Sequence, residues 1–333
     1  MTIHILGLEP IESRYTYQWA TLIPEMFESS GADTKVYRGR VVQTNIGNSS
    51  DFLAWIPSNI WKSTQLAEFA TAMLNGRVKD GDVVFVTDFW NPAAINIRYM
   101  ADMTGLDLKL VGFTHAGFYD PWDRLGIQLK DTQWAGVSES AIVACYDKLI
   151  FATEFHRKLF EQQYGSSDKN VVLPFFGNYI TRNTSIKADS ILFCQRNAPE
   201  KQPEMFDRLK SVASDCVAEW ISTCDKPLPH REYIERLKSA KFVVSFALQE
   251  TLGIVPFEAL ANGCCIIVPD RLSYSEMYTD DVKYDGSIED CERVLRRLAA
   301  LPQDRLDKII EENYNKARMF FDGTPTVEFI KGL

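Results

Sequence analysis

Two carboxylates, Glu250 and Glu258, stand eight residues apart in one stretch of the sequence, residues 241–270. An apolar run of strand length, residues 242–248, precedes the first of them, and a second apolar run, residues 264–268, closes the stretch. A carboxylate can accept two hydrogen bonds at once, so Glu258 is suited to hold a pair of ligand hydroxyls. The alternative is an acid that complements the dipole of its helix, and for Glu250 a solvated loop acid.

The loop that follows the first apolar run leads into a short expected helix, residues 256–261. Pro at its start and Asn262-Gly263 at its end are typical helix boundaries. Gly253 lets the backbone approach a ligand closely, and the N–H groups at a helix start bind phosphate. Our candidates for a phosphate site are therefore the backbone amides of Thr251, Leu252, Gly253 and Ile254.

Two bases, Arg196 and Lys201, stand five residues apart after another expected strand, residues 190–194. Arg offers phosphate a planar fork of donors, and Lys offers a compact positive charge. The alternative for the pair is two surface bases in a loop. With the two carboxylates in the same half of the chain, the bases indicate a site for an anionic ligand.

Apolar runs of strand length alternate with helical patterns along the whole chain. Such alternation predicts parallel sheets with helices on both faces. Before an expected linker at residues 174–183, the strands are expected at residues 3–8, 34–37, 82–86, 108–113, 148–152 and 171–173. After it, they are expected at residues 190–194, 217–221, 242–248 and 264–268. We therefore predict two doubly wound α/β domains, at residues 1–176 and 184–310, with a C-terminal helix and tail at 311–333 that pack back on the first domain.

Ligands of open parallel sheets bind at the carboxyl ends of the strands. Asp88 and His115 each follow an expected strand, as do the residues named above. The alternative for Asp88 is to cap the helix that follows it, and for His115 a structural role. Asp80 and Asp82 form a D-x-D pattern, but they precede a strand, and we expect them at the wrong edge for a metal–diphosphate site.

Composition narrows the setting. The chain has 333 residues, 46% hydrophobic and 24% charged, with a net charge of −9, which is typical of a soluble globular protein with two cores. No stretch reaches the roughly 18 to 20 uninterrupted apolar residues that a membrane helix needs, and the N-terminus lacks the basic start of a signal peptide. Seven cysteines without C-x-x-C spacing indicate buried thiols, a cytoplasmic location and no structural metal.

These features resemble the C-terminal domain of retaining GT-B glycosyltransferases of the family 4 type, whose donor signature is E-x7-E. Glu250 and Glu258 match that spacing, and Arg196 and Lys201 match a pair of bases that the family carries after the first strand of this domain. The likeness covers about residues 145–285. It implies a GT-B fold, two Rossmann-like domains facing across a cleft, and a nucleotide-sugar donor, most often a UDP-sugar, with no other cofactor and no essential metal.

The resemblance also implies roles. Glu258 would accept both hydroxyls of the donor ribose, and Glu250 would contact the sugar near its anomeric carbon. The amides of residues 251–254 would hold the diphosphate. Arg196 and Lys201 would stabilise the leaving group, and His115 would assist at the sugar. The implied catalytic set is Glu250, His115, Arg196 and Lys201. The implied donor set is Glu258, Arg196, Lys201, Thr251, Leu252, Gly253 and Ile254.

The first half of the chain departs from that family, because no Gly-Gly loop follows its first strand. The segments ESRYTYQW and THAGFYDPWDR resemble instead glycosyltransferases of tailed bacteriophages. Aromatic and Arg side chains there could stack a base or a sugar ring. The acceptor-binding residues predicted from these segments and the strand ends are Arg14, Tyr15, Asp88, Tyr119, Trp122 and Arg124.

The phage resemblance implies a hydroxymethylated pyrimidine in double-stranded DNA as acceptor, modified in the cytoplasm of a bacterial host. The charge of the first half counts against it, since residues 1–150 hold 12 Lys and Arg against 17 Asp and Glu, a balance of −5. A DNA site would need clustering of Arg14, Arg38, Arg40, Lys62, Arg98 and Arg124. The alternatives are a small molecule, a lipid or a surface glycan as acceptor, or a relative that does not transfer sugar, namely a sugar-nucleotide epimerase or a binding module.

Overall fold

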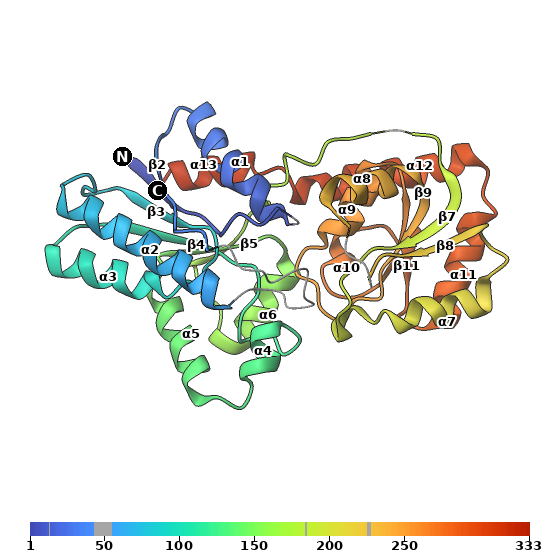
Figure 1. Cartoon of the computed structure of the whole chain (residues 1–333), viewed down its shortest axis with the longest axis horizontal. Coiled ribbons are helices and arrows are strands. Elements are labelled where there is room, and N and C mark those ends of the chain that lie inside the picture. Colours follow the sequence, from blue (N-terminus) through green and yellow to red (C-terminus); the bar gives the residue numbers. More distant parts are fainter. Residues whose placement is uncertain (13, 43–54, 184, 225–227) are drawn as a thin grey trace. The chain divides into compact units, whose positions relative to one another are not determined.

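The computed structural model describes residues 1–12, 14–42, 55–183, 185–224 and 228–333. The chain forms two compact units (Figure 1). Unit 1 comprises Met1–Phe176 and Asp322–Leu333, and unit 2 comprises Gly177–Phe321.

Unit 1 is built on a parallel six-stranded sheet with the order β2-β1-β3-β4-β5-β6. Its strands are β1 (Thr2–Leu6), β2 (Asp33–Tyr37), β3 (Val83–Val86), β4 (Lys109–Phe113), β5 (Lys148–Phe151) and β6 (Asn170–Val172). Its helices are α1 (Tyr15–Ser29), α2 (Trp55–Leu74), α3 (Ala93–Thr104), α4 (Arg124–Leu129), α5 (Gln133–Cys145), α6 (Glu154–Tyr164) and α13 (Thr324–Lys331). Helices α2 and α3 lie on one face of the sheet, and α1 and α13 lie on the other (Figure 1).

Unit 2 is built on a parallel five-stranded sheet with the order β11-β10-β9-β7-β8. Its strands are β7 (Ala188–Phe193), β8 (Glu219–Ser222), β9 (Ala240–Val244), β10 (Cys265–Pro269) and β11 (Lys283–Tyr284). Its longer helices are α7 (Glu204–Ala213), α8 (His230–Ser239), α9 (Ile254–Ala261), α11 (Ile288–Ala299) and α12 (Gln303–Ala317). Its short ones are η1 (Pro199–Lys201), α10 (Tyr274–Met277), η2 (Asp280–Val282) and η3 (Arg318–Phe320).

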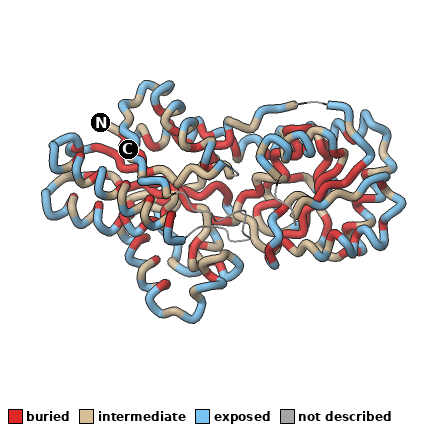
Figure 2. Tube along the Cα trace, viewed as in Figure 1, coloured by how far each residue is buried: buried red, intermediate tan, exposed pale blue. Residues whose placement is uncertain are grey.

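Helices α8, α9 and α12 cover one face of this second sheet, and α7 and α11 cover the other (Figure 1). The central strands of both sheets are buried on both faces (Figure 2), which is why they read as continuous apolar runs rather than as alternating patterns. The predicted fold class, two parallel α/β sheets, is confirmed.

Several predicted boundaries shift. The strand expected at residues 242–248 ends at Val244, and residues 245–253 form a loop. Helix α9 begins at Ile254, two residues before Pro256, which fits its first turn because N–H groups there have no partner within the helix. The sequence did not predict α4, whereas α13 lies within the C-terminal helix and tail expected at residues 311–333.

The last helix, α13, belongs to unit 1 although it follows unit 2 in the chain. The Thr326 hydroxyl donates to the Pro174 carbonyl at 2.6 Å, and Lys331 Nζ donates to the Ser30 carbonyl at 2.7 Å. Val327 and Ile330 are buried against the rest of the unit. Unit 1 is therefore completed by a segment from far along the sequence.

Candidate functional site

The carboxyl edge of the sheet in unit 2 brings Lys201 to Glu250. Lys201 Nζ lies 3.1 Å from Glu250 Oε2 and donates to the Gln249 carbonyl at 2.5 Å. Lys201 is only 6% exposed, whereas the Glu250 side chain is 23% exposed. A buried ammonium needs a charged partner and hydrogen bonds. The pair therefore fixes a positive charge and a partly open carboxylate at the turn between β9 and α9.

Arg196 lies nearby in sequence but in a different environment. Its guanidinium donates to Glu200 Oε1 at 2.9 Å, and its side chain is 42% exposed. Glu200, in η1, also accepts the Leu248 amide through its own carbonyl at 2.7 Å. The two predicted bases thus reach the same loop region, one buried and paired with Glu250 and one half-exposed and paired with Glu200.

Gly253 turns the chain from this loop into α9. Its φ of 85° lies in the left-handed region, and a Cβ there would stand 2.5 Å from Tyr274 Cε1. The Tyr274 hydroxyl lies 3.1 Å from Ser245 Oγ, so the ring is anchored to the end of β9. Leu252 is buried beside the turn, while Thr251 and Ile254 are half-buried. The first amides of α9 thus form a helix start suited to an anion.

Glu258 lies in the second turn of α9 and is 7% exposed. The Tyr233 hydroxyl, from α8, donates to Glu258 Oε2 at 2.6 Å. Burial raises the pKa of Glu258 to about 7, and the Tyr233 hydrogen bond works in the opposite direction. The predicted ribose ligand is therefore a buried carboxyl group that titrates near neutral pH.

Sequence reasoning missed two residues of this region. Tyr233 lay unremarked within an expected helix, and no spacing rule links it to Glu258. Arg271 follows β10, and the strand-end rule could have found it. Its guanidinium donates to the carbonyls of Phe246 at 2.9 Å and Ala247 at 3.0 Å, and so braces the loop after β9.

In unit 1, Asp88 lies at the carboxyl end of β3, where it accepts from Lys62 Nζ at 3.0 Å and from the Trp90 amide at 3.2 Å. Burial would raise the pKa of Asp88, but the Lys62 charge, the neighbouring His115 and the hydrogen bonds from Lys62 and the Trp90 amide together outweigh it, and the pKa is lowered. The alternative of a helix cap is wrong, because Asn91 Oδ1 accepts the Ala93 amide at the start of α3.

His115 follows β4, and both of its ring nitrogens are engaged. Nε2 lies 2.8 Å from the Thr87 carbonyl, which can only accept, so Nε2 carries the proton and Nδ1 accepts from the Tyr15 hydroxyl at 3.1 Å. Burial lowers the pKa of His115, which keeps the ring neutral. A role for His115 at the reaction centre would therefore require Tyr15 to give way to a ligand.

The loop after His115 is held by a buried carboxylate that the sequence did not indicate. Glu139, in α5, accepts from the Phe118 amide at 2.5 Å, the Tyr119 amide at 3.0 Å and the Trp90 indole at 2.7 Å. A Cβ at Gly117 would collide with the same carboxylate. Glu139 therefore fixes the path of the loop on which His115 lies.

The predicted acceptor residues differ in whether a ligand could reach them. The prediction that Tyr119 binds the acceptor is wrong. Its ring is buried in the core of unit 1 and its hydroxyl contacts buried His156, so it offers no face to a ligand. Trp122 is 50% exposed, and Arg124 is half-buried at the start of α4. Arg14, at the start of α1, is half-buried beside Tyr15.

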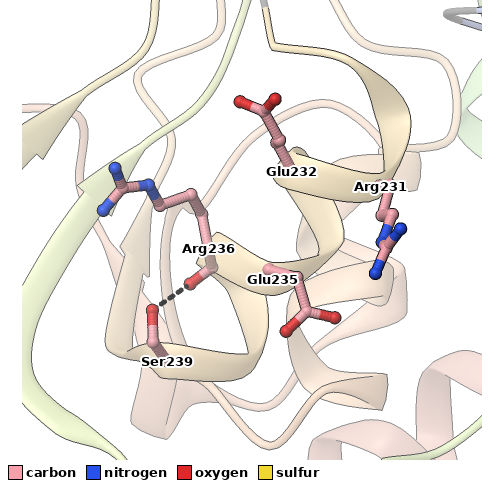
Figure 3. A pocket seen from close by; sticks show the side chains of 5 residues that line it. All are labelled: Arg231, Glu232, Glu235, Arg236 and Ser239. Atoms are coloured by element: carbon pink, nitrogen blue, oxygen red, sulfur yellow. Dashed lines mark hydrogen bonds between the residues drawn. The ribbon is translucent and has the colours of Figure 1, made fainter.

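A surface hollow of about 450 Å³ lies on the outer face of α8 (Figure 3) and is lined by Arg231, Glu232, Glu235, Arg236 and Ser239. Its acidic and basic side chains point in different directions rather than toward one point (Figure 3), so it is not a site for one charged ligand. Among the described residues, no cluster of His, Cys, Asp and Glu could hold a metal ion. No described helix is long and apolar enough to cross a membrane.

Several solved structures superpose on the full length of this chain. Sucrose-phosphate synthase from Thermosynechococcus elongatus superposes with a TM-score of 0.69 and 12% identity, over 100% of this chain and 98% of its own. HepE of Anabaena, solved with UDP and glucose, gives 0.63 and 11%, over 100% of both chains. The UDP-forming α,α-trehalose-phosphate synthase from Burkholderia vietnamiensis gives 0.63 and 11%, over 100% of this chain and 98% of its own.

These similarities show the GT-B fold. Residues 199–322 match a family model described as glycosyl transferase-like. The matched segment contains Lys201, Glu250 and Glu258, the residues that form the site in unit 2. The fold is therefore that of GT-B glycosyltransferases, and part of unit 2 is similar to the glycosyl transferase-like family. No match was found among curated proteins.

Gly253→Ala should disturb the site in two ways. The Ala residue is strained at a φ of 85°, and its Cβ would stand 2.5 Å from the Tyr274 ring. We expect a loss of more than about 1 kcal/mol in the free energy of unfolding. Gly105→Ala is the matched control, because Gly105 has a φ of 73° in the same left-handed region with open space around its Cβ position. Equal losses by chemical denaturation for the two variants would contradict a packing role for Gly253.

Glu258→Gln should stabilise the protein above neutral pH. A folded pKa of about 7 against 4.5 for the free group means that the folded state binds more protons, so stability falls as pH rises from 4.5 through 7. Gln removes that cost, about 3 kcal/mol at pH 8 and little at pH 4.5. Thermal unfolding at both pH values measures the difference. A variant that is no more stable than the wild type at pH 8 would contradict the raised pKa.

Proposed function

We propose that the protein transfers a sugar from a nucleotide-sugar donor, with a UDP-sugar as first candidate, to an acceptor hydroxyl with retention of anomeric configuration. The observation that supports this most is the gathering of Lys201, Glu250 and Glu258 around the start of α9, at the carboxyl edge of a parallel sheet. HepE, with the same fold, was solved in complex with UDP and glucose.

In this proposal each group of unit 2 has one role. Glu258 accepts the ribose hydroxyls, and the first amides of α9 hold the diphosphate. Lys201 and Arg196 stabilise the charge that the diphosphate gains as its oxygen leaves the anomeric carbon. Glu250, oriented by Lys201, accepts hydroxyls of the donor sugar.

The transfer step replaces one bond at the anomeric carbon with another. The bond to the diphosphate oxygen breaks as the acceptor oxygen attacks from the same face, and the acceptor proton passes to the departing diphosphate. Charge is balanced by Lys201, Arg196 and the helix start, so we expect no essential metal. Transfer should then persist when a chelator is present.

Lys201→Met should test this assignment. Loss of one preorganised charge in a water-poor site lowers kcat by about 10²- to 10³-fold. Lys241→Met is the control, since Lys241 lies at the start of β9, the opposite edge, and pairs with Asp189. The measurement is release of nucleoside diphosphate from a panel of nucleotide sugars, with circular dichroism to show that both variants fold. A kcat for Lys201→Met within threefold of the wild type would contradict the role of Lys201.

For the acceptor we favour a hydroxymethylated pyrimidine in DNA, modified in the cytoplasm. Support comes from Arg38 and Arg40, which follow β2 at the carboxyl edge of the sheet in unit 1. Both are exposed, and neither makes an ion pair with any residue that the structure describes. Their turn is fixed on α2, because a Cβ at Gly39 would collide with the Trp61 carbonyl and the Arg40 amide donates to Thr64 Oγ1 at 2.7 Å.

Two other basic residues considered for DNA binding are already engaged in ion pairs within unit 1. Lys62 is bound to Asp88, and Arg98 donates to Asp147 and to the Cys145 carbonyl. The second candidate acceptor is a small molecule such as a sugar phosphate, which the names of two compared synthases favour. Lipid or glycan acceptors, an epimerase and a binding module are further outcomes of the same assays.

The double variant Arg38→Ser, Arg40→Ser should separate the two acceptors. If both residues contact phosphates, transfer to hydroxymethylcytosine DNA weakens. The slope of the logarithm of the DNA-binding constant against the logarithm of the salt concentration also falls in magnitude, by up to about two. The control pair Arg305→Ser, Arg318→Ser removes the same charge from exposed sites in unit 2. DNA mass and diphosphate release are measured together. Wild-type release without any gain in DNA mass would contradict the DNA acceptor and favour a small molecule.

A further inference from the structure

Helix α8 has two faces with different character. The outer face carries the charged residues around the hollow of Figure 3, whereas Tyr233 turns inward to α9. Its hydroxyl donates to Glu258 Oε2 at 2.6 Å, a short hydrogen bond of the kind formed by an ionised acceptor. The contact joins two helices that pack side by side on one face of the sheet.

The other groups around Glu258 supply no charge to it. The Cys194 thiol follows β7; burial raises its pKa most, and the nearby Glu258 charge adds to the rise. Tyr179 lies near Tyr233. Lys187 is occupied elsewhere, since its ammonium donates to the carbonyls of Leu237, Lys238 and Asn262. Among the described residues, Tyr233 is the one side chain that donates to the Glu258 carboxylate.

A buried carboxylate with a single donor keeps free acceptor positions. The Tyr233 hydroxyl occupies Oε2, which leaves Oε1 and the remaining lone pair of Oε2 to a ligand. The tyrosine also restricts rotation of the carboxylate, because its half-buried side chain lies on a helix that packs against α9. A ligand with two adjacent hydroxyls then meets acceptors that are already oriented.

We propose that Tyr233 is a positioning residue of the donor site, which orients the Glu258 carboxylate and favours its ionised form for the two hydroxyls of the donor ribose. This inference rests on the proposed role of Glu258. It adds a function for α8 that neither the E-x7-E spacing nor the pair of bases indicates.

A consequence for pH follows from the same contact. Burial raises the pKa of Glu258 to about 7, and the Tyr233 hydrogen bond opposes that rise. Without the hydroxyl the pKa moves further up, so a smaller fraction of Glu258 is ionised at pH 7. Binding of a ribose diol to the carboxylate should therefore weaken in Tyr233→Phe most strongly near neutral pH, and recover as the pH rises.

The experiment compares the wild type, Tyr233→Phe and Tyr278→Phe. Tyr278 is a matched control in the same unit, since its ring is buried and its hydroxyl has no hydrogen-bond partner among the described residues. UDP affinity is measured by calorimetry from pH 6 to pH 8.5. The phosphate of UDP titrates equally for all three proteins, so differences between them report on the protein. For Tyr233→Phe we expect about tenfold weaker binding at pH 7 and less than threefold at pH 8.5.

A second measurement needs no ligand. Carbon-13 NMR of the Glu258 side-chain carboxyl, assigned with Glu258→Gln, should show a higher titration midpoint in Tyr233→Phe than in the wild type and an unchanged midpoint in Tyr278→Phe. An unchanged midpoint in Tyr233→Phe, or a loss of affinity equal at every pH, would overturn the positioning role. Failure of the wild type to bind UDP, with the midpoint shift intact, would instead count against the proposed UDP donor.

Discussion

The left-handed turn at Gly253 is the constraint on which the site in unit 2 depends. It directs the chain from the loop after β9 into α9 while the Tyr274 ring stands where a side chain would be. Tyr274 is held in turn by Ser245 at the end of β9. Because of this close packing, the start of α9, Glu250 and Glu258 have fixed places with respect to the end of the sheet.

Around that turn, and in unit 1, several ionisable groups are buried, and the cost of removing each from water is offset by different contacts. Lys201 is paired with a carboxylate, and Glu139 accepts several hydrogen bonds. Asp82, which the sequence placed at the wrong edge for a metal site, accepts from His4 and from the Thr2 amide between two strands. Glu258 has the least compensation, one tyrosine hydroxyl, and its pKa is accordingly raised by burial. An incompletely compensated buried carboxyl is unfavourable for stability, and the proposed donor ribose would supply the missing hydrogen bonds.

Much of this could be predicted from the sequence. Continuous apolar runs indicated buried parallel strands, and the strand-end rule placed Asp88 and His115 at the carboxyl edge. The spacing of two carboxylates and two bases indicated the region where Lys201 meets Glu250. What could not be predicted depends on helix packing. Tyr233 and Glu258 are 25 residues apart and on different helices, and no local pattern tells which face of a helix meets which neighbour. The same limit applies to Tyr119, whose ring packs into the core although its loop is rich in polar residues.

The connection between the units bears on how the chain folds as it is synthesised. Unit 2 is one continuous segment, Gly177–Phe321, inserted into unit 1, whose last helix, α13, comes after it. Domains generally fold as units during synthesis, the N-terminal one first. In this chain the second unit can be complete before the first, because all residues of unit 2 are synthesised before α13 leaves the ribosome. Until then, the face of unit 1 that Val327 and Ile330 cover is exposed to chaperones, to proteases and to other nascent chains.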